Sequence, residues 1–209
     1  MIKTAITGTW RFAVYLLMVA VFVLIGYFTS REDFLQLFVL YSAAFGLYLV
    51  LLKYADTNDL VKEGRYLGIF LRFVLLFSIP NLTDDFYRFI WDGKLLLNGI
   101  NPYAFSPEQI TLNNVHHTNF TNVVDTHLFN ELNSKQYFSI YPPVCQFLFS
   151  GAAFLSFNNT YVNIVLLKFF IFLFEAGTIL LLPKLLVQLK MPVKYQLIYT
   201  LNPLIILEL

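Results

Sequence analysis

The chain has 209 residues, of which 58% are hydrophobic, 18% are aromatic and only 13% are charged. In soluble domains about a quarter of all residues are normally charged. This composition therefore excludes an ordinary soluble domain and predicts a membrane protein. The net charge of +1 provides no basic surplus for nucleic acid, and the single cysteine, Cys145, excludes an internal disulfide framework.

Apolar runs that suit membrane spans begin near the N-terminus. A transmembrane helix needs about 17–25 mainly apolar residues. We expect the first two at residues 11–29, retained as an anchor and not cleaved as a signal peptide, and at residues 34–52. A polar connection, residues 53–65, then precedes a third and shorter run at residues 66–80.

A long polar segment, residues 81–140, separates these runs from the remaining ones. A fourth run covers residues 142–157, a fifth covers residues 161–182, and a sixth begins near Tyr195. The last residue still lies inside this sixth run, so we expect the chain to be an N-terminal fragment of a longer protein.

Three charged residues interrupt the apolar runs. Charges are expensive inside a membrane and are therefore usually paired or placed along a cavity. We expect Lys168 and Glu175 to face the interior of the helix bundle in structural pairs, with a groove for lipid phosphate as the alternative role. Arg72 can be paired in the same way, or can extend its charge to the membrane surface if it lies near a helix end.

The distribution of Lys and Arg in short loops predicts the orientation. It favours a cytoplasmic N-terminus and a cytoplasmic connection at residues 53–65, so that three spans place residues 81–140 outside. The lysines of residues 183–194 also favour the cytoplasm, whereas a count of five spans places them outside. We therefore expect that one of the short runs, 66–80 or 142–157, does not cross fully.

These patterns predict an all-α, polytopic membrane protein with about five to six spans. We divide it into N-terminal transmembrane helices at residues 1–80, an external loop at residues 81–140 and further transmembrane helices at residues 141–209.

The external loop begins with an amphipathic helix at residues 84–97, which Asn81 or Thr83 can cap. At about 100° per residue, its apolar side has four members, Phe86, Ile90, Gly93 and Leu97. Its polar side has three carboxylates around one arginine, Asp84, Asp85, Arg88 and Asp92. The helix is expected to lie along the membrane surface and to end at the GINPY sequence.

Two interpretations of the polar side stay open. Any helix on a membrane surface needs a polar face, and this explanation requires no function. The adjacent pair Asp84 and Asp85 favours a site, because carboxylates at the water boundary can act as a general base or hold a cation.

The sequences TDDFYRFIWDGKLLLNGINPYAFSP, IYPPV and LNPLIILE resemble the GT-C fold membrane glycosyltransferases. The resemblance is strongest to bacterial polyprenyl-phosphate-dependent mannosyltransferases, including glycosyltransferase family 87, and more distant to GPI mannosyltransferase I. The corresponding elements are Asp84 and Asp85, Gly99 to Tyr103, and Tyr141 to Pro143, and two further positions also match, Tyr87 and Asp92. The resemblance implies the N-terminal half of a GT-C fold with juxtamembrane helices in the external loop.

The resemblance also implies a reaction. A hexose, with mannose as the expectation, moves from a polyprenyl-phosphate donor to a hydroxyl of a glycan or lipid acceptor with inversion. Asp84 is the first candidate for the general base and Asp85 the second. Arg88 and Lys94, or a basic residue outside this chain, would stabilise the lipid phosphate. No obligatory metal is expected, although a divalent ion at the two aspartates would be compatible with the residues.

The remaining candidate substrate-binding residues are four aromatic side chains and one carboxylate, Tyr87, Trp91, Asp92, Tyr103 and Tyr141. Trp and Tyr side chains also suit the membrane interface, and anchoring there is the default role for most of these rings. Trp91 and Tyr103 are the candidates for stacking on a sugar ring. The expected location is the bacterial inner membrane, with the site facing the periplasm and with membrane lipid around the spans.

Two alternative functions remain from the sequence, a transporter or flippase for lipid-linked sugars and an inactive truncated membrane protein. A zinc site at His116, His117 and His127 is not expected, because their spacing matches no known ligand pattern and no cysteine supports them.

Overall fold

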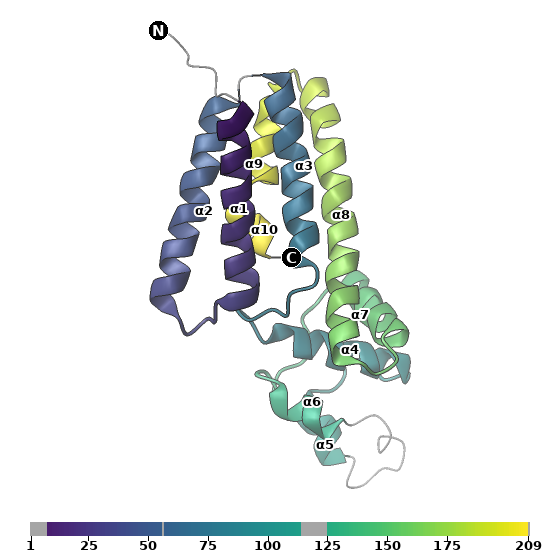
Figure 1. Ribbon diagram of the computed structural model, residues 1–209. Helices are drawn as coiled ribbons and strands as arrows, with labels where there is room; N and C mark the ends of the chain where they lie inside the picture. Colours follow the sequence, from purple (N-terminus) through teal and green to yellow (C-terminus); the bar gives the residue numbers. More distant parts are fainter. Residues whose placement is uncertain (1–7, 56, 114–124, 209) are drawn as a thin grey trace. The chain divides into compact units, whose positions relative to one another are not determined.

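The computed structural model describes residues 8–55, 57–113 and 125–208, and within them it contains α-helices, one short 3-10 helix and no strand (Figure 1). The predicted all-α fold is confirmed. His116 and His117 lie outside the described residues.

The chain divides into two compact units. The first unit consists of Met1–Asn81 and Ile171–Leu209, and the second unit consists of Leu82–Phe170. The division by sequence into residues 1–80, 81–140 and 141–209 stays a prediction.

The first unit is a bundle of long helices with short helices packed against them. Its elements are α1 (Gly8–Phe28), α2 (Phe34–Tyr54), α3 (Asn58–Leu75), the later part of α8 (Thr160–Gln188), η1 (Val193–Tyr195), α9 (Gln196–Thr200) and α10 (Pro203–Leu207). Consecutive long helices run in opposite directions, and α3 lies beside α1 (Figure 1).

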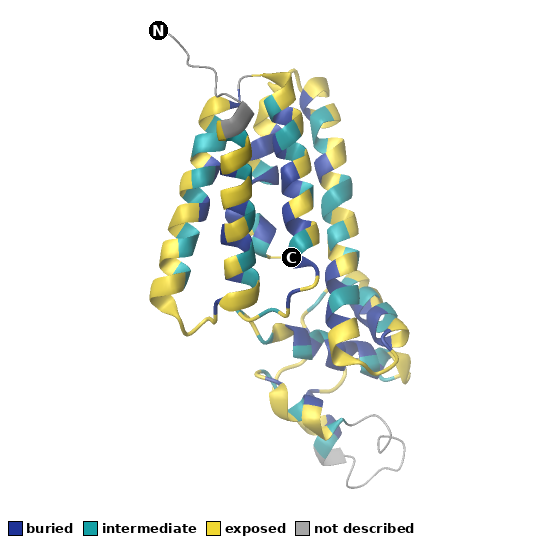
Figure 2. Cartoon of the chain, viewed as in Figure 1, coloured by how far each residue is buried: buried dark blue, intermediate teal, exposed yellow. Residues whose placement is uncertain are grey.

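Three of the described helices, α1, α2 and α8, are long and apolar enough to cross a membrane. They match the predicted spans at residues 11–29, 34–52 and 161–182. Many side chains of α1 and α2 are exposed and few are buried (Figure 2), although their sequences are strongly apolar. An exposed apolar surface of this kind suits contact with lipid, and the chain is a membrane protein.

The other predicted spans differ in detail. Helix α3 begins at Asn58, inside the predicted polar connection, because the Thr57 side chain caps it by accepting a hydrogen bond from the Leu60 amide (3.3 Å). Helix α7 (Pro143–Leu155) has only 13 residues. The apolar run from residue 195 is divided into short helices, since Pro203 cannot continue the hydrogen-bonding of α9.

A buried ion pair connects the helices of the first unit. Arg72 is fully buried, and its Nε lies 3.2 Å from Oε2 of Glu175. Its Nη1 also donates to the backbone carbonyls of Gly68 (3.0 Å) and Thr200 (2.8 Å). The hydroxyl of Tyr199 donates to the other Glu175 oxygen at 2.6 Å. The expected structural pairing of Glu175 is therefore confirmed, with Arg72 as a partner that the sequence did not identify, and Arg72 is buried and does not snorkel. The pair joins α3, α8 and α9.

The second unit is built around a contact between α4 (Asp85–Leu97) and α7, with α5 (Pro107–Asn113), α6 (Thr126–Glu131) and the start of α8 beside them. Its core contains buried apolar side chains from α4, α5, α6, α7 and α8. Gly93 permits the close approach, because a Cβ on this residue would collide with the backbone carbonyl of Phe149 in α7.

We expect Gly93→Ala to lower the free energy of unfolding by about 1–3 kcal/mol, because an added methyl must displace the backbone of α7. Thermal unfolding of the detergent-solubilised protein measures this change. Gly151→Ala in α7 is the matched control, since its Cβ would meet only the ring of Phe170 at 3.8 Å. Equal unfolding temperatures for the two variants would contradict the assignment of Gly93 to the helix contact.

Candidate functional site

Helix α4 places the predicted carboxylate pair at its N-terminus. The helix covers Asp85–Leu97, so the helix predicted at residues 84–97 is confirmed. The Asp85 amide donates to Oγ1 of Thr83 at 3.2 Å, and Asp84 is the N-cap residue. A carboxylate in the first turn is favoured by the positive end of the helix dipole. Gly99, with a φ of +73°, follows the last turn and ends the helix.

The polar side of α4 is not the open water-facing surface that the helical pattern predicts. Arg88 and Asp92 are buried, with 4% and 0% of their side chains exposed, and form an ion pair of 2.8 Å between Nε and Oδ1. Nη1 of Arg88 donates to the carbonyls of Ser134 (3.2 Å) and Tyr137 (2.9 Å). The prediction that Arg88 contacts a lipid phosphate does not fit this placement, because its guanidinium is already enclosed by the protein.

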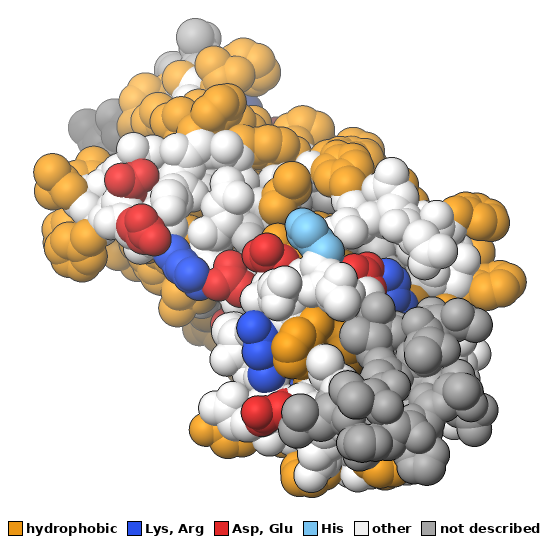
Figure 3. All heavy atoms as spheres, turned by 90° about the horizontal axis from the view of Figure 1, so that it is seen from below, with side chains coloured by type: hydrophobic (Ala, Val, Ile, Leu, Met, Phe, Trp, Pro, Cys, Tyr) orange, Lys and Arg blue, Asp and Glu red, His pale blue; other side chains and the backbone are white. Residues whose placement is uncertain are grey.

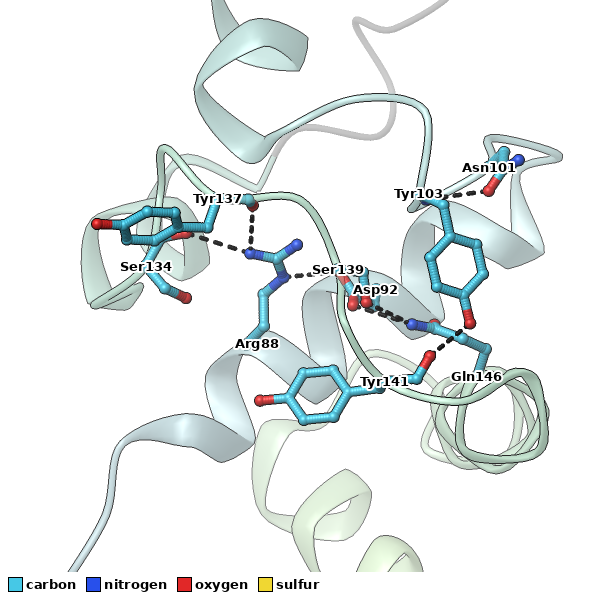
Figure 4. Close-up of polar contacts among 9 residues, drawn as sticks. All are labelled: Arg88, Asp92, Asn101, Tyr103, Ser134, Tyr137, Ser139, Tyr141 and Gln146. Carbon is cyan, nitrogen blue, oxygen red and sulfur yellow. Dashed lines mark hydrogen bonds and ion pairs between the residues drawn. The ribbon is translucent and has the colours of Figure 1, made fainter.

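Gln146, a residue that the sequence analysis missed, completes this polar cluster (Figure 4). Its buried Nε2 donates to Oδ2 of Asp92 (3.1 Å) and to Oγ of Ser139 (2.7 Å). Both oxygens of Asp92 are therefore hydrogen-bonded, which also argues against its predicted direct role in substrate binding. A glutamine within the apolar run of residues 142–157 was the available signal.

The GINPY and YPP sequences meet next to this cluster. The hydroxyl of Tyr103 donates to the carbonyl of Tyr141, and the amide of Ser139 donates to the carbonyl of Pro102 at 3.4 Å (Figure 4). The Tyr103 amide is held in turn by Oδ1 of Asn101 at 3.0 Å. The structure thus brings GINPY and YPP together next to the Arg88–Asp92 cluster, although Tyr103 and Tyr141 are 38 positions apart in the sequence.

Tyr141 lies half-buried between two aromatic rings. Its ring contacts Phe89 edge-on at 5.0 Å and Phe149 at 5.6 Å. Burial raises the pKa of its hydroxyl, and the negative charge of Asp85 raises it further. Tyr141 therefore stays a neutral phenol at neutral pH, able to donate or accept a hydrogen bond.

The pKa of Tyr87, on the first turn of α4, is raised like that of Tyr141. The side chain is half-buried, and burial, together with the charges of Glu131 and Asp84, raises the pKa of its hydroxyl. Its ring contacts that of Phe86, with 4.2 Å between the ring centroids. A protonated hydroxyl remains available for a hydrogen bond to a substrate.

The two aspartates at the start of α4 differ in exposure and contacts. Asp85 is exposed, and its Oδ1 accepts a hydrogen bond from Nδ2 of Asn133 at 3.1 Å, whereas Asp84 is half-buried. Acidic side chains lie at the surface close to basic ones in the view from below (Figure 3). The predicted base candidates are therefore at least partly accessible to solvent.

Lys94, predicted to bind phosphate, lies near the other end of the helix. Its Nζ forms an ion pair of 3.0 Å with Oδ2 of Asp125, which also caps α6 by accepting from the Leu128 amide. Burial acts to raise the pKa of Asp125, but the hydrogen bonds from Leu128 and Lys94 outweigh it, and the pKa is lowered. Lys94 lies nine positions after Asp85, or about 13 Å further along the helix.

The two candidates for sugar stacking also differ. Trp91 is 2% exposed and packs against the ring of Phe129, with 5.8 Å between the centroids. Its predicted stacking role does not fit this placement, because the core covers the ring. Tyr103 is 40% exposed, so its ring stays accessible.

Within the described ranges, no group of three or more His, Cys, Asp and Glu side chains could hold a metal ion. His127 is exposed on α6. The residues near Asp84 and Asp85 thus present carboxylate and phenol groups, which suit proton transfer and hydrogen bonding to hydroxyls.

We expect Asp92→Ala to lower the free energy of unfolding by about 3–5 kcal/mol, because it leaves the buried Arg88 guanidinium without a carboxylate. Denaturant unfolding in detergent measures the loss. Lys94→Gln is the control on the same helix, and its half-exposed ion pair predicts a loss below about 1 kcal/mol. The double variant Arg88→Met, Asp92→Leu should recover most of the stability. A small effect of Asp92→Ala would contradict the structural role of the pair.

No curated protein and no solved structure matches the chain. A family profile does match, and it covers residues 6–209. The description of that family names a sugar transfer that forms an α-(1→6) mannosyl linkage. Because the match extends over nearly all of the sequence, the chain belongs to the MptA_B family, alpha-(1->6)-mannopyranosyltransferase, N-terminal domain.

Proposed function

We propose that the chain supplies the carboxylate part of a site that transfers mannose from a polyprenyl-phosphate donor to a hydroxyl of a glycan or lipid acceptor. Membership in a mannosyltransferase family implies a sugar donor and an acceptor at a membrane. The observation that carries the proposal is the partly exposed pair Asp84 and Asp85, held at the start of a helix that a buried ion pair anchors.

The proposed reaction is a single inverting displacement. The acceptor oxygen forms a bond to C1 of mannose while the bond from C1 to the phosphate oxygen breaks. The hydroxyl proton passes to a carboxylate, and the electron pair of the broken bond stays on the polyprenyl phosphate. Inversion converts a β-linked donor into the α-linkage named by the family description. Asp84 or Asp85 is the proposed base, which must come within hydrogen-bond reach of the hydroxyl.

The leaving phosphate needs positive charge close to it. Arg88 is buried in its ion pair, and Lys94 is paired with Asp125. We therefore place the phosphate-stabilising cation outside α4. Asp84 and Asp85 can accept a proton without a metal, and we propose that no divalent ion is obligatory. Tyr103 and Tyr141 are the proposed aromatic contacts for sugar.

The proposed orientation follows from the length of α7. Its 13 residues span about 20 Å, less than the hydrocarbon core of about 30 Å, so we propose that it does not cross. Helix α3 is less apolar than α1, α2 and α8, but its 18 residues span about 27 Å, and we propose that it makes the third crossing after α1 and α2, so that α8 returns to the side where the chain began. The lysines of residues 183–194 then lie in the cytoplasm, as the distribution of positive charge requires.

With the N-terminus in the cytoplasm, α4 and the carboxylate pair lie on the outer side of the membrane. For a bacterial cell we propose the inner membrane, with the site facing the periplasm. This arrangement removes the disagreement between span count and charge that five full crossings produce.

The variants Asp84→Asn and Asp85→Asn identify the base. We expect substitution of the aspartate that acts as the base to lower kcat by about 100-fold or more, because an amide cannot take the proton. Membranes containing the full-length protein are assayed with radiolabelled mannose on polyprenyl phosphate and an α-mannoside acceptor. Glu108→Gln, which removes an exposed carboxylate of the same unit, is the control. Full transfer by both aspartate variants would refute the proposed base, and loss of transfer with EDTA would refute metal independence.

We expect single cysteines at Gln136 and Thr160, the two sides of α7, to react with a membrane-impermeant maleimide from the same side. A cysteine at Met191, beyond α8, should react only from the opposite side. All three positions are exposed, and the native Cys145 is replaced by serine in each variant. Labelling of Gln136 and Thr160 from opposite sides would show that α7 crosses the membrane.

A further inference from the structure

Asn133 lies against the carboxylate at the start of α4. Its Nδ2 donates to Oδ1 of Asp85 at 3.1 Å across 48 residues of sequence. We propose that Asn133 is a positioning residue that orients Asp85, and that Asp85 is the proton acceptor of the carboxylate pair. The inference rests on the proposed mannosyltransferase function and extends it to a residue that no motif includes.

Both ends of this hydrogen bond are anchored to one buried group. Arg88 lies one turn after Asp85 on α4. Its guanidinium holds the carbonyls of Ser134 and Tyr137, the first of which belongs to the residue directly after Asn133. The buried pair of Arg88 with Asp92 therefore fixes both the helix that carries Asp85 and the segment that carries Asn133.

The segment is held at a second point further along. Oγ of Ser139 accepts a hydrogen bond of 2.7 Å from the buried Gln146 of α7. Residues 134–139 are thus fastened at their beginning by α4 and at their end by α7. Asn133 lies directly before this fastened segment, so its side chain loses little conformational freedom when it donates to Asp85. The contact can therefore define one orientation of the Asp85 carboxylate.

The orientation distinguishes the two aspartates. With Oδ1 of Asp85 bound to Asn133, Oδ2 is the oxygen left to approach an acceptor hydroxyl, and the side chain is exposed to solvent. Asp84 occupies the N-cap position and is half-buried. A base needs access and a fixed direction together, since a misplacement of about 1 Å can cost about 100-fold in rate.

The test compares three variants of Asn133 in membranes containing the full-length protein, with polyprenyl mannosyl phosphate and an α-mannoside as probes. Asn133→Ala should lower kcat about 10- to 100-fold with KM for the donor unchanged. Asn133→Gln keeps the amide donor and should restore most of kcat. Asn133→Asp keeps the shape but places a second negative charge beside Asp85, and should lower kcat at least as far as Asn133→Ala.

The matched control is Asn130→Ala on α6, whose exposed side chain forms none of these contacts. It should keep full activity, and all Asn variants should keep the wild-type unfolding temperature. Wild-type kcat in Asn133→Ala, or no recovery in Asn133→Gln, would overturn the positioning role. Full activity of Asp85→Asn together with loss of activity in Asp84→Asn would overturn the choice of Asp85 as the base, but not the proposed function. Absence of mannose transfer by the wild-type protein would instead refute the proposed function.

Discussion

The ion pair between Arg88 and Asp92 is the interaction on which the second unit depends. Two charges taken out of water destabilise a fold unless every donor and acceptor finds a partner. In this unit the partners come from other parts of the chain, namely the amide of Gln146 on α7 and the carbonyls of Ser134 and Tyr137. Satisfying one buried pair therefore fixes α4, α7 and residues 134–137.

This constraint explains how a site can form at one end of α4. The buried turns hold the helix, and the first turn is left to present Asp84 and Asp85 outward. The ring of Tyr141 and the accessible ring of Tyr103 are joined to the same cluster by backbone hydrogen bonds. Carboxylate and phenol groups on a rigid support suit the transfer of a sugar to a hydroxyl, where small displacements of a base are costly.

The first unit also encloses a buried arginine, with different residues around it. Arg72 is enclosed by Glu175 and two backbone carbonyls, and the Tyr199 hydroxyl occupies the second carboxylate oxygen. One of these carbonyls belongs to Thr200, the last residue of α9. Because the helix is interrupted before Pro203, this carbonyl has no helical hydrogen-bond partner, and Arg72 provides one. The buried Arg72 thus stabilises the break between α9 and α10. Its burial has a structural explanation that does not depend on a transported ligand.

The sequence by itself determined the all-α membrane class, the helices α1 and α2, and the limits of α4. These features depend on local periodicity, on the hydrogen bond from the Asp85 amide to Thr83 and on the stop at Gly99, which neighbouring residues define. The tertiary structure decided which side of α4 is buried. It enclosed Arg88 and covered Trp91, both predicted to meet substrate, and it brought Gln146 and Asn133 to the helix. Periodicity along one helix cannot reveal these outcomes, because burial depends on partners about forty to fifty residues away that only the packed chain brings into contact.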